Sequence, residues 1–198
     1  MRHKMLLVVW LVATLFTCTS LACAGVLPIF QDSFDRGSES VPELLNGSVP
    51  DVRPGSETWI APGAFATDGS VLTPGSGGKA YVAFTPTANK VYTLKVTADP
   101  ADSGVDTDWI SLGFASTMDG NPWDNVGPWM LYRGNGQVTA FYNGLNGREN
   151  VIAAGSTTAA RELAIVLDTT SALWRAEWLV DGTSVRTYAY TANPTINY

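Results

Sequence analysis

Residues 174–189 read WRAEWLVDGTSVRTYA, and this stretch decides the fold class. Apolar and polar side chains alternate on both sides of Asp181-Gly182, a dipeptide typical of a two-residue type I′ hairpin turn. Such alternation predicts two antiparallel strands with one face turned toward a hydrophobic core. The predicted pairs on that face are Val180 with Thr183, Trp178 with Val185, Ala176 with Thr187, and Trp174 with Ala189.

The opposite face of this hairpin carries its polar residues. The same register places Glu177 opposite Arg186, as a salt bridge, and Arg175 opposite Tyr188, as a cation–π contact. Each contact would contribute roughly 0.2–1 kcal/mol. A register shifted by one residue would bury Glu177 and Arg186, so hydrophobic pattern and turn chemistry support the same pairing.

Short apolar or alternating stretches recur through the chain, separated by turn signals, and no helix is predicted after the N-terminal leader. Between residues 31 and 72 the chain is rich in Gly, Pro and Ser, with isolated aromatics (Phe34, Trp59 and Phe65) expected to pin loops onto the sheets. Together these features predict an all-β, two-sheet antiparallel β-sandwich. The further predicted strands are 79–85, 91–98, 109–116, 129–132, 137–142 and 161–168.

The N-terminus has the features of a secretory signal peptide. A basic start over residues 2–4 precedes an apolar run over 5–16, and Ala22-Cys23-Ala24 has the small-x-small pattern of a cleavage site. We expect residues 1–24 to be removed and residues 25–198 to form a single secreted or cell-surface domain. The alternative is an uncleaved anchor, but a membrane span needs about 20 apolar residues. No second apolar span follows.

Composition narrows the possible functions of the mature chain. Its precursor contains one histidine, His3, and two cysteines, Cys18 and Cys23, all within the predicted leader. Cleavage therefore excludes Ser-His-Asp and Cys-His catalysis, and disulfides, from the mature domain. The formal net charge of −6 argues against nucleic acid as a partner.

Several short motifs follow one another along the chain. The motifs are DSFD at 32–35, LNGSVPD at 45–51, ETW at 57–59, GKAY at 78–81, DWISLGFA at 108–115 and WLVDGT at 178–183. Their order resembles the concanavalin A-like lectin/glucanase superfamily, specifically LamG-like modules of secreted bacterial proteins, many of which carry a C-terminal sorting segment of the PEP-CTERM type. The resemblance covers residues 30–198.

This resemblance implies a concanavalin A-like jelly roll whose last strand pairs near the first, around residues 32–35. The sequence reaches Tyr198 where that closing strand would begin, so we expect either a domain truncated before its closing C-terminal strand or a fold that closes differently.

Related glucanases use a Glu-x-Asp-x-x-Glu strand, and none of the glutamates after the leader has Asp two residues later. A non-catalytic protein is therefore expected. A glycoside hydrolase of another type is the alternative among enzymes, and it would need two suitably separated carboxyl groups.

The stretch 123–129, WDNVGPW, is the best candidate for a carbohydrate site. Sugar rings present apolar C–H faces that stack on aromatic rings, while amides, carboxylates and arginines bind the hydroxyl groups. The alternative is that both tryptophans cap the sandwich, and Trp59, Trp109, Trp174 and Trp178 are expected in the core or on sheet faces. The predicted carbohydrate-binding residues are Trp123, Asp124, Asn125, Trp129, Tyr132, Arg133, Tyr142 and Asn143.

Aspartates gather before the strand predicted at 109–116. Calcium takes six to eight oxygen ligands, so Asp102, Asp106 and Asp108 form a candidate Ca²⁺ site. Their spacing matches no fixed motif, and such residues are also common in ordinary turns. No other cofactor is expected.

The sequence thus favours a secreted, non-catalytic carbohydrate-binding or adhesion module with a glycan as partner. The alternative is a structural or interaction protein of the cell envelope or extracellular matrix that has no sugar site.

Overall fold

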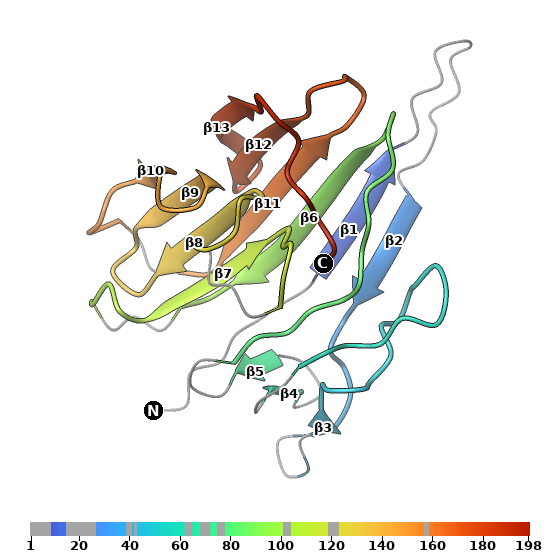
Figure 1. The fold of residues 1–198 in the computed structure, drawn as a ribbon. Helices are drawn as coiled ribbons and strands as arrows, with labels where there is room; N and C mark the ends of the chain where they lie inside the picture. Colours follow the sequence, from blue (N-terminus) through green and yellow to red (C-terminus); the bar gives the residue numbers. More distant parts are fainter. Residues whose placement is uncertain are drawn as a thin grey trace.

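A computed structural model describes residues 9–14, 27–38, 41, 43–61, 65–67, 72–74, 78–100, 104–118, 123–156 and 159–198. These residues form three sheets and no helix, and every pairing between neighbouring strands is antiparallel. Two larger sheets face each other in Figure 1, which is consistent with the predicted β-sandwich. Within the described part, no helix is long and apolar enough to cross a membrane.

The larger sheet has six strands in the order β13-β12-β11-β6-β1-β2. Its centre is the pairing of β6 with β11, which runs without interruption from Arg161 opposite Ala98 to Asp168 opposite Val91. Alternation explains both strands, because every second side chain points to the core. The strands are β1 (Val9–Thr14), β2 (Leu27–Asp32), β6 (Val91–Ala98), β11 (Arg161–Asp168), β12 (Arg175–Val180) and β13 (Thr183–Ala189).

The second sheet has four strands in the order β10-β9-β8-β7. Side chains from both sheets meet in one hydrophobic core, in which Trp178 of β12 is fully buried. The indole Nε1 of Trp178 donates a hydrogen bond of 2.8 Å to the main-chain carbonyl of Trp129, which ties the two sheets together. The strands are β7 (Trp109–Gly113), β8 (Trp129–Arg133), β9 (Val138–Asn143) and β10 (Gly147–Ile152).

The Asp181-Gly182 hairpin forms as predicted at its turn but not along its whole length. Both turn residues have positive φ, 51° and 75°, as a type I′ turn requires. Val180 pairs with Thr183, and then a β-bulge at Val185 shifts the register.

Beyond that bulge the predicted pairs are wrong by one residue. Trp178 lies opposite Arg186, and Glu177 lies opposite Thr187. Arg186 instead forms an ion pair of 2.9 Å with Glu149 of β10 and lies 5.1 Å from the centroid of the Tyr142 ring. The bulge therefore turns Arg186 toward the second sheet, away from its expected partner.

The strand predicted at 79–85 does not form. Tyr81 makes only an isolated bridge with Ile60, and the amide of Phe84 donates to the carbonyl of Asn197. This segment is an extended connection that supplies aromatic side chains to the core.

The irregular region after β2 is organised by a small sheet and a buried polar network. The small sheet has the order β3-β4-β5 and contains β3 (Glu43–Leu44), β4 (Phe65–Thr67) and β5 (Leu72–Pro74). Phe34, Trp59 and Phe65 are buried, as expected for residues that pin loops onto the sheets.

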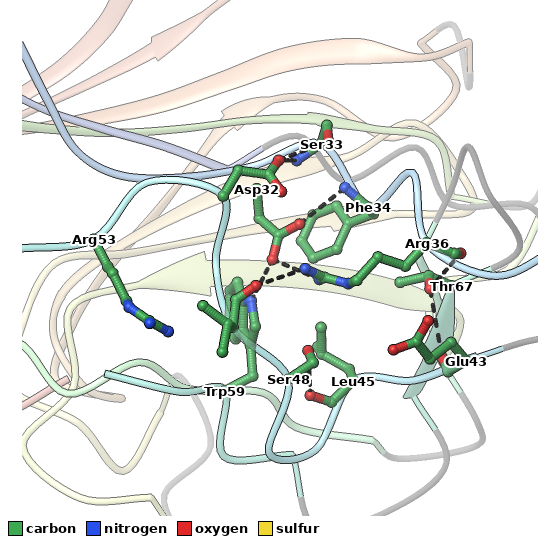
Figure 2. A network of polar contacts seen from close by, with 12 residues as sticks. Asp32, Ser33, Phe34, Arg36, Glu43, Leu45, Ser48, Arg53, Trp59 and Thr67 are labelled. Carbon is green, nitrogen blue, oxygen red and sulfur yellow. Dashed lines mark hydrogen bonds and ion pairs between the residues drawn. The ribbon is translucent and has the colours of Figure 1, made fainter. Parts of the chain in front are cut away.

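Asp32 lies at the centre of this network, at 1% exposure (Figure 2). One carboxylate oxygen accepts hydrogen bonds from the Arg36 guanidinium, at 2.7 Å, and from the Trp59 indole, at 2.6 Å. The other accepts from the main-chain N–H of Phe34 at 2.9 Å. We call these three contacts the Asp32 network. They satisfy a buried charge and hold the loop in place.

Part of the predicted leader is a strand of the larger sheet. β1 pairs with β6 on one side and with β2 on the other, with a register irregularity between Leu11 and Val12. The structure describes the chain with this segment in place, and removal of residues 1–24 stays a prediction.

Candidate functional site

The first four residues of strand β8, 129–132, are buried on both faces of the strand. A surface site in this sheet therefore has to lie beside them. Met130 and Tyr132 point into the core between the sheets, whereas Trp129 and Leu131 join a second cluster on the outer face of the four-stranded sheet. Gly113, opposite Trp129, leaves room for the indole, since a Cβ there would lie 2.3 Å from it.

The C-terminal residues cover part of this outer face and are held there by hydrogen bonds. The N–H of Ala115 donates to the carbonyl of Tyr198, and the Asn197 side chain donates to the carbonyl of Ser116. Beyond the part that these C-terminal residues cover, the outer face of the four-stranded sheet is open to solvent.

An open hollow of about 440 Å³ lies beside the second cluster, and we call it the tryptophan hollow. The hollow is shallow and largely open to solvent, so a ligand would rest on its surface rather than be enclosed. The described residues that line it are Asp106, Thr107, Trp109, Trp123, Arg133, Leu145 and Arg148.

Two tryptophans form the aromatic part of the hollow. Trp109 begins β7 and is 38% exposed, which is unusual for so large an apolar side chain. Trp123 comes from the loop between β7 and β8, and its ring meets that of Trp109 edge to face at 5.8 Å. The hollow therefore offers a fixed aromatic surface that is partly open to solvent.

Strand pairing positions the remaining wall. Trp109 pairs with Arg133 at the end of β8, so their side chains lie side by side on one face of the sheet. Arg148 of β10 pairs with Phe141 of the second cluster and thus belongs to the same outer face.

A glycine turn brings Leu145 to this wall. Gly144 has a φ of +54°, and a Cβ there would lie 2.6 Å from the carbonyl of Trp123, which accepts a hydrogen bond from the Leu145 amide. This contact fixes the loop that carries Trp123 against the turn between β9 and β10.

The arginines of the hollow differ from Arg161 and Arg186 of the larger sheet, both of which form ion pairs. The Arg133 guanidinium donates to the main-chain carbonyl of Asp106, which holds it in place. Over the described ranges, neither Arg133 nor Arg148 forms an ion pair, whereas Arg161 pairs with Asp181 at 3.0 Å. The hollow thus combines an aromatic surface with two arginines that are not neutralised by a described carboxylate.

Three of the predicted carbohydrate-binding residues are buried, and we remove them from the candidate site. Trp129 packs in the second cluster. Tyr132 is fully buried and donates a hydrogen bond of 2.7 Å to the carbonyl of Ala159. Asn125 accepts from the amide and hydroxyl of Ser116, so it stabilises the loop.

Burial also sets the acidity of Tyr132. Loss of solvation raises the pKa of its hydroxyl above the ordinary value, although the nearby Arg161 opposes this effect. A neutral hydroxyl that donates to a carbonyl is a structural contact.

Tyr142 and Asn143 lie on β9 but do not line the hollow. The Tyr142 ring stacks on Tyr188 with centroids 4.4 Å apart and also meets Trp178, so it serves the packing between the sheets. Asp124 and Asn143 are exposed near the hollow without being part of its lining. Of the eight predicted residues, the structure therefore brings Trp123 and Arg133 together in the hollow.

The predicted calcium ligands do not form a described cluster. Asp102 lies outside the described residues. Asp106 lines the hollow, and Asp108 accepts a hydrogen bond from the amide of Gly134 through its main-chain carbonyl. No group of three potential metal ligands converges among the residues that are described, and the calcium site stays a prediction.

Four residues of the hollow were not among the predicted site residues: Thr107, Trp109, Leu145 and Arg148. Trp109 was expected in the core or on a sheet face, and its position on the open outer face follows only from the pairing of β7 with β8. Arg148 carries no local signal, because β10 reaches the site only through its pairing with β9.

No family model, curated protein or solved structure matches this chain.

Proposed function

We propose that the protein is a secreted, non-catalytic carbohydrate-binding module and that the tryptophan hollow is its binding site. The observation that carries the proposal is the partly exposed Trp109 ring, held edge to face by Trp123 beside Arg133. A sugar ring can stack its C–H face on an exposed indole while guanidinium groups donate to its hydroxyl oxygens.

The charge pattern of the hollow supports binding rather than hydrolysis. Glycoside hydrolysis of the usual kind needs two carboxyl groups on opposite sides of the scissile bond. Among the described lining residues, Asp106 is the single carboxylate. A second candidate function, an envelope or matrix protein without a sugar site, is favoured by the burial of Trp129 in the second cluster.

We further propose that the domain is a concanavalin A-like jelly roll of the LamG-like type. The order of the sequence motifs supports this assignment, as do the two facing antiparallel sheets. The predicted leader supports secretion.

A glycan-array screen tests the proposal. The full chain would be expressed in a secreting host, its N-terminus read by intact mass, and its binding compared with that of a Trp109→Ala/Trp123→Ala variant. We expect the variant to remain folded and to lose at least tenfold in affinity, because a central aromatic contact commonly contributes more than about 1.4 kcal/mol.

Leu173→Ala is the control, since this side chain is 51% exposed and lies in the turn between β11 and β12 of the larger sheet. It should bind like the wild type. A folded wild-type protein that binds no glycan would contradict the proposal and support the structural role.

A further inference from the structure

The tryptophan hollow carries net positive charge on a protein that is acidic as a whole. The chain has a formal net charge of −6, yet the described lining contains two arginines and one aspartate. We propose that the ligand of the hollow is an anionic glycan, whose carboxylate or sulfate group binds Arg133 and Arg148. This inference rests on the proposed carbohydrate-binding function and specifies its ligand class.

The positions of the arginines suit a charged sugar. Trp109 and Arg133 are directly opposed on neighbouring strands, and residues opposed in this way have Cβ atoms about 4.5–5.5 Å apart. A pyranose ring stacked on the Trp109 indole would thus bring a substituent at its edge within reach of the Arg133 guanidinium. Planar guanidinium groups match carboxylate and sulfate oxygens, which can accept two parallel hydrogen bonds.

Arg133 is held ready for such a contact. One of its N–H groups donates to the main-chain carbonyl of Asp106, which fixes the guanidinium beside the hollow. Arg148 is exposed and forms no ion pair within the described chain. An anion in the hollow would compensate the one positive charge by which the two arginines exceed the single aspartate of the described lining.

Asp106 opposes the binding of an anion, and the structure gives it a separate role. Its main-chain carbonyl, not its carboxylate, is the atom that accepts from Arg133. The side chain can therefore be changed without removing the contact that positions Arg133.

Calorimetric titration of the full-length, secreted protein tests the inference with three sets of oligosaccharides of equal length. The sets are oligogalacturonides, sulfated galacto-oligosaccharides and neutral galacto-oligosaccharides. We expect at least one anionic set to bind tenfold or more tightly than the neutral set. Raising the salt concentration to 0.5 M should reduce this preference, because exposed charges are screened.

Arg148→Gln should weaken binding of the preferred anionic set about tenfold, as expected for loss of one charge-assisted hydrogen bond. Its effect on the neutral set should be smaller, because a hydroxyl oxygen carries no charge, and Arg148→Lys should restore part of the loss. Arg175→Gln, an exposed arginine on β12 of the other sheet, is the matched control and should have no effect.

The outcomes separate this inference from the proposed function. Preference for uronides or for sulfated sugars would support it and identify the anionic group. Neutral sugars bound equally well, with dependence on Trp109 but not on Arg148, would overturn the anionic ligand and leave carbohydrate binding intact. Binding of none of the sets by the folded protein would overturn both.

Discussion

The Asp32 network and the tryptophan hollow use the same three residue types in opposite ways. In the network, a buried aspartate accepts from an arginine and a tryptophan, and both donors are within 2.7 Å. In the hollow, Asp106, Arg133 and the tryptophans lie at the surface, and the arginines form no ion pair in the described part of the chain.

This difference shows how burial decides what a polar cluster does. A buried charge must be paired, and both carboxylate oxygens of Asp32 accept hydrogen bonds from the chain itself, so the Asp32 network contributes to stability. A solvated cluster needs no internal partners and can exchange water for a ligand. Composition alone does not separate the two, since both contain Asp, Arg and Trp.

Asp32→Ala should give the largest loss of stability. It leaves the Arg36 guanidinium without its carboxylate and removes the acceptor of the Trp59 indole, so we expect a loss of about 3–5 kcal/mol in the free energy of unfolding. Urea denaturation would measure this loss. Asp106→Ala is the matched change in the hollow and should stay within about 0.5 kcal/mol of the wild type.

Equal losses in Asp32→Ala and Asp106→Ala would contradict the comparison. If Asp32→Ala does not fold, Asp32→Asn keeps the shape and one acceptor oxygen and should show an intermediate loss.

Trp59→Phe should destabilise by about 1.5–3 kcal/mol, because the variant loses a hydrogen bond to a charged acceptor in a buried site. Trp109→Phe, the same substitution in the hollow, should change stability by less than about 0.5 kcal/mol. Thermal or urea unfolding of both variants gives the contrast directly. A larger loss in Trp109→Phe would mean that the hollow is structural.

Tyr190 is a third polar group to set beside the Asp32 network and the hollow. Its hydroxyl is buried and has no hydrogen-bond acceptor among the described residues. Loss of solvation, assisted by Tyr188, raises the pKa of this hydroxyl far above 10.0. In the unfolded chain Tyr190 ionises near pH 10, whereas in the folded protein it stays protonated. The contribution of Tyr190 to the free energy of unfolding is therefore complete below about pH 10 and decreases as the pH rises above 10. Each such group contributes about 1.4 kcal/mol per pH unit.

Tyr190→Phe should therefore unfold like the wild type at pH 7, within about 1 kcal/mol, and lose less stability between pH 10 and 11. Urea denaturation across that range measures both effects. An unchanged pH slope in the variant would show that Tyr190 ionises normally in the folded protein.

Asp106→Asn should have the smallest effect on stability, below about 0.5 kcal/mol, because its exposed carboxylate forms no ion pair within the described ranges. It should raise the affinity for an anionic glycan a few-fold, since one repulsive charge is removed. Calorimetry with the preferred anionic oligosaccharide measures this gain. A weaker complex would show that the Asp106 side chain itself binds the sugar.

Strands with regular alternation were predictable from sequence, and their irregularities were not. The strand at 161–168 forms with the predicted ends, and the type I′ turn forms at Asp181-Gly182. The bulge at Val185 has no signal within the hairpin, because it is coupled to the contacts of Arg186 with Glu149 and Tyr142 on the second sheet.

The candidate site was predicted only where its residues are local in sequence. Trp123 and Arg133 lie near one another along the chain, whereas Trp109 and Arg148 join them through pairings of β7 with β8 and β10 with β9. The aromatic-rich stretch also drew Trp129 into the prediction, because sequence does not show that the outer face of β8 is covered.

The placement of β1 bears on the predicted leader. β1 is an interior strand, antiparallel to both β2 and β6, so these two neighbours run parallel to each other. If residues 1–24 are a leader, as the sequence predicts, a precursor that folded first would hold residues 9–14 within hydrogen-bonded sheet. Cleavage after Ala24 would in turn leave two strand edges whose N–H and C=O groups need a new partner of the opposite direction. The predicted cleavage would therefore entail a rearrangement of strand pairing.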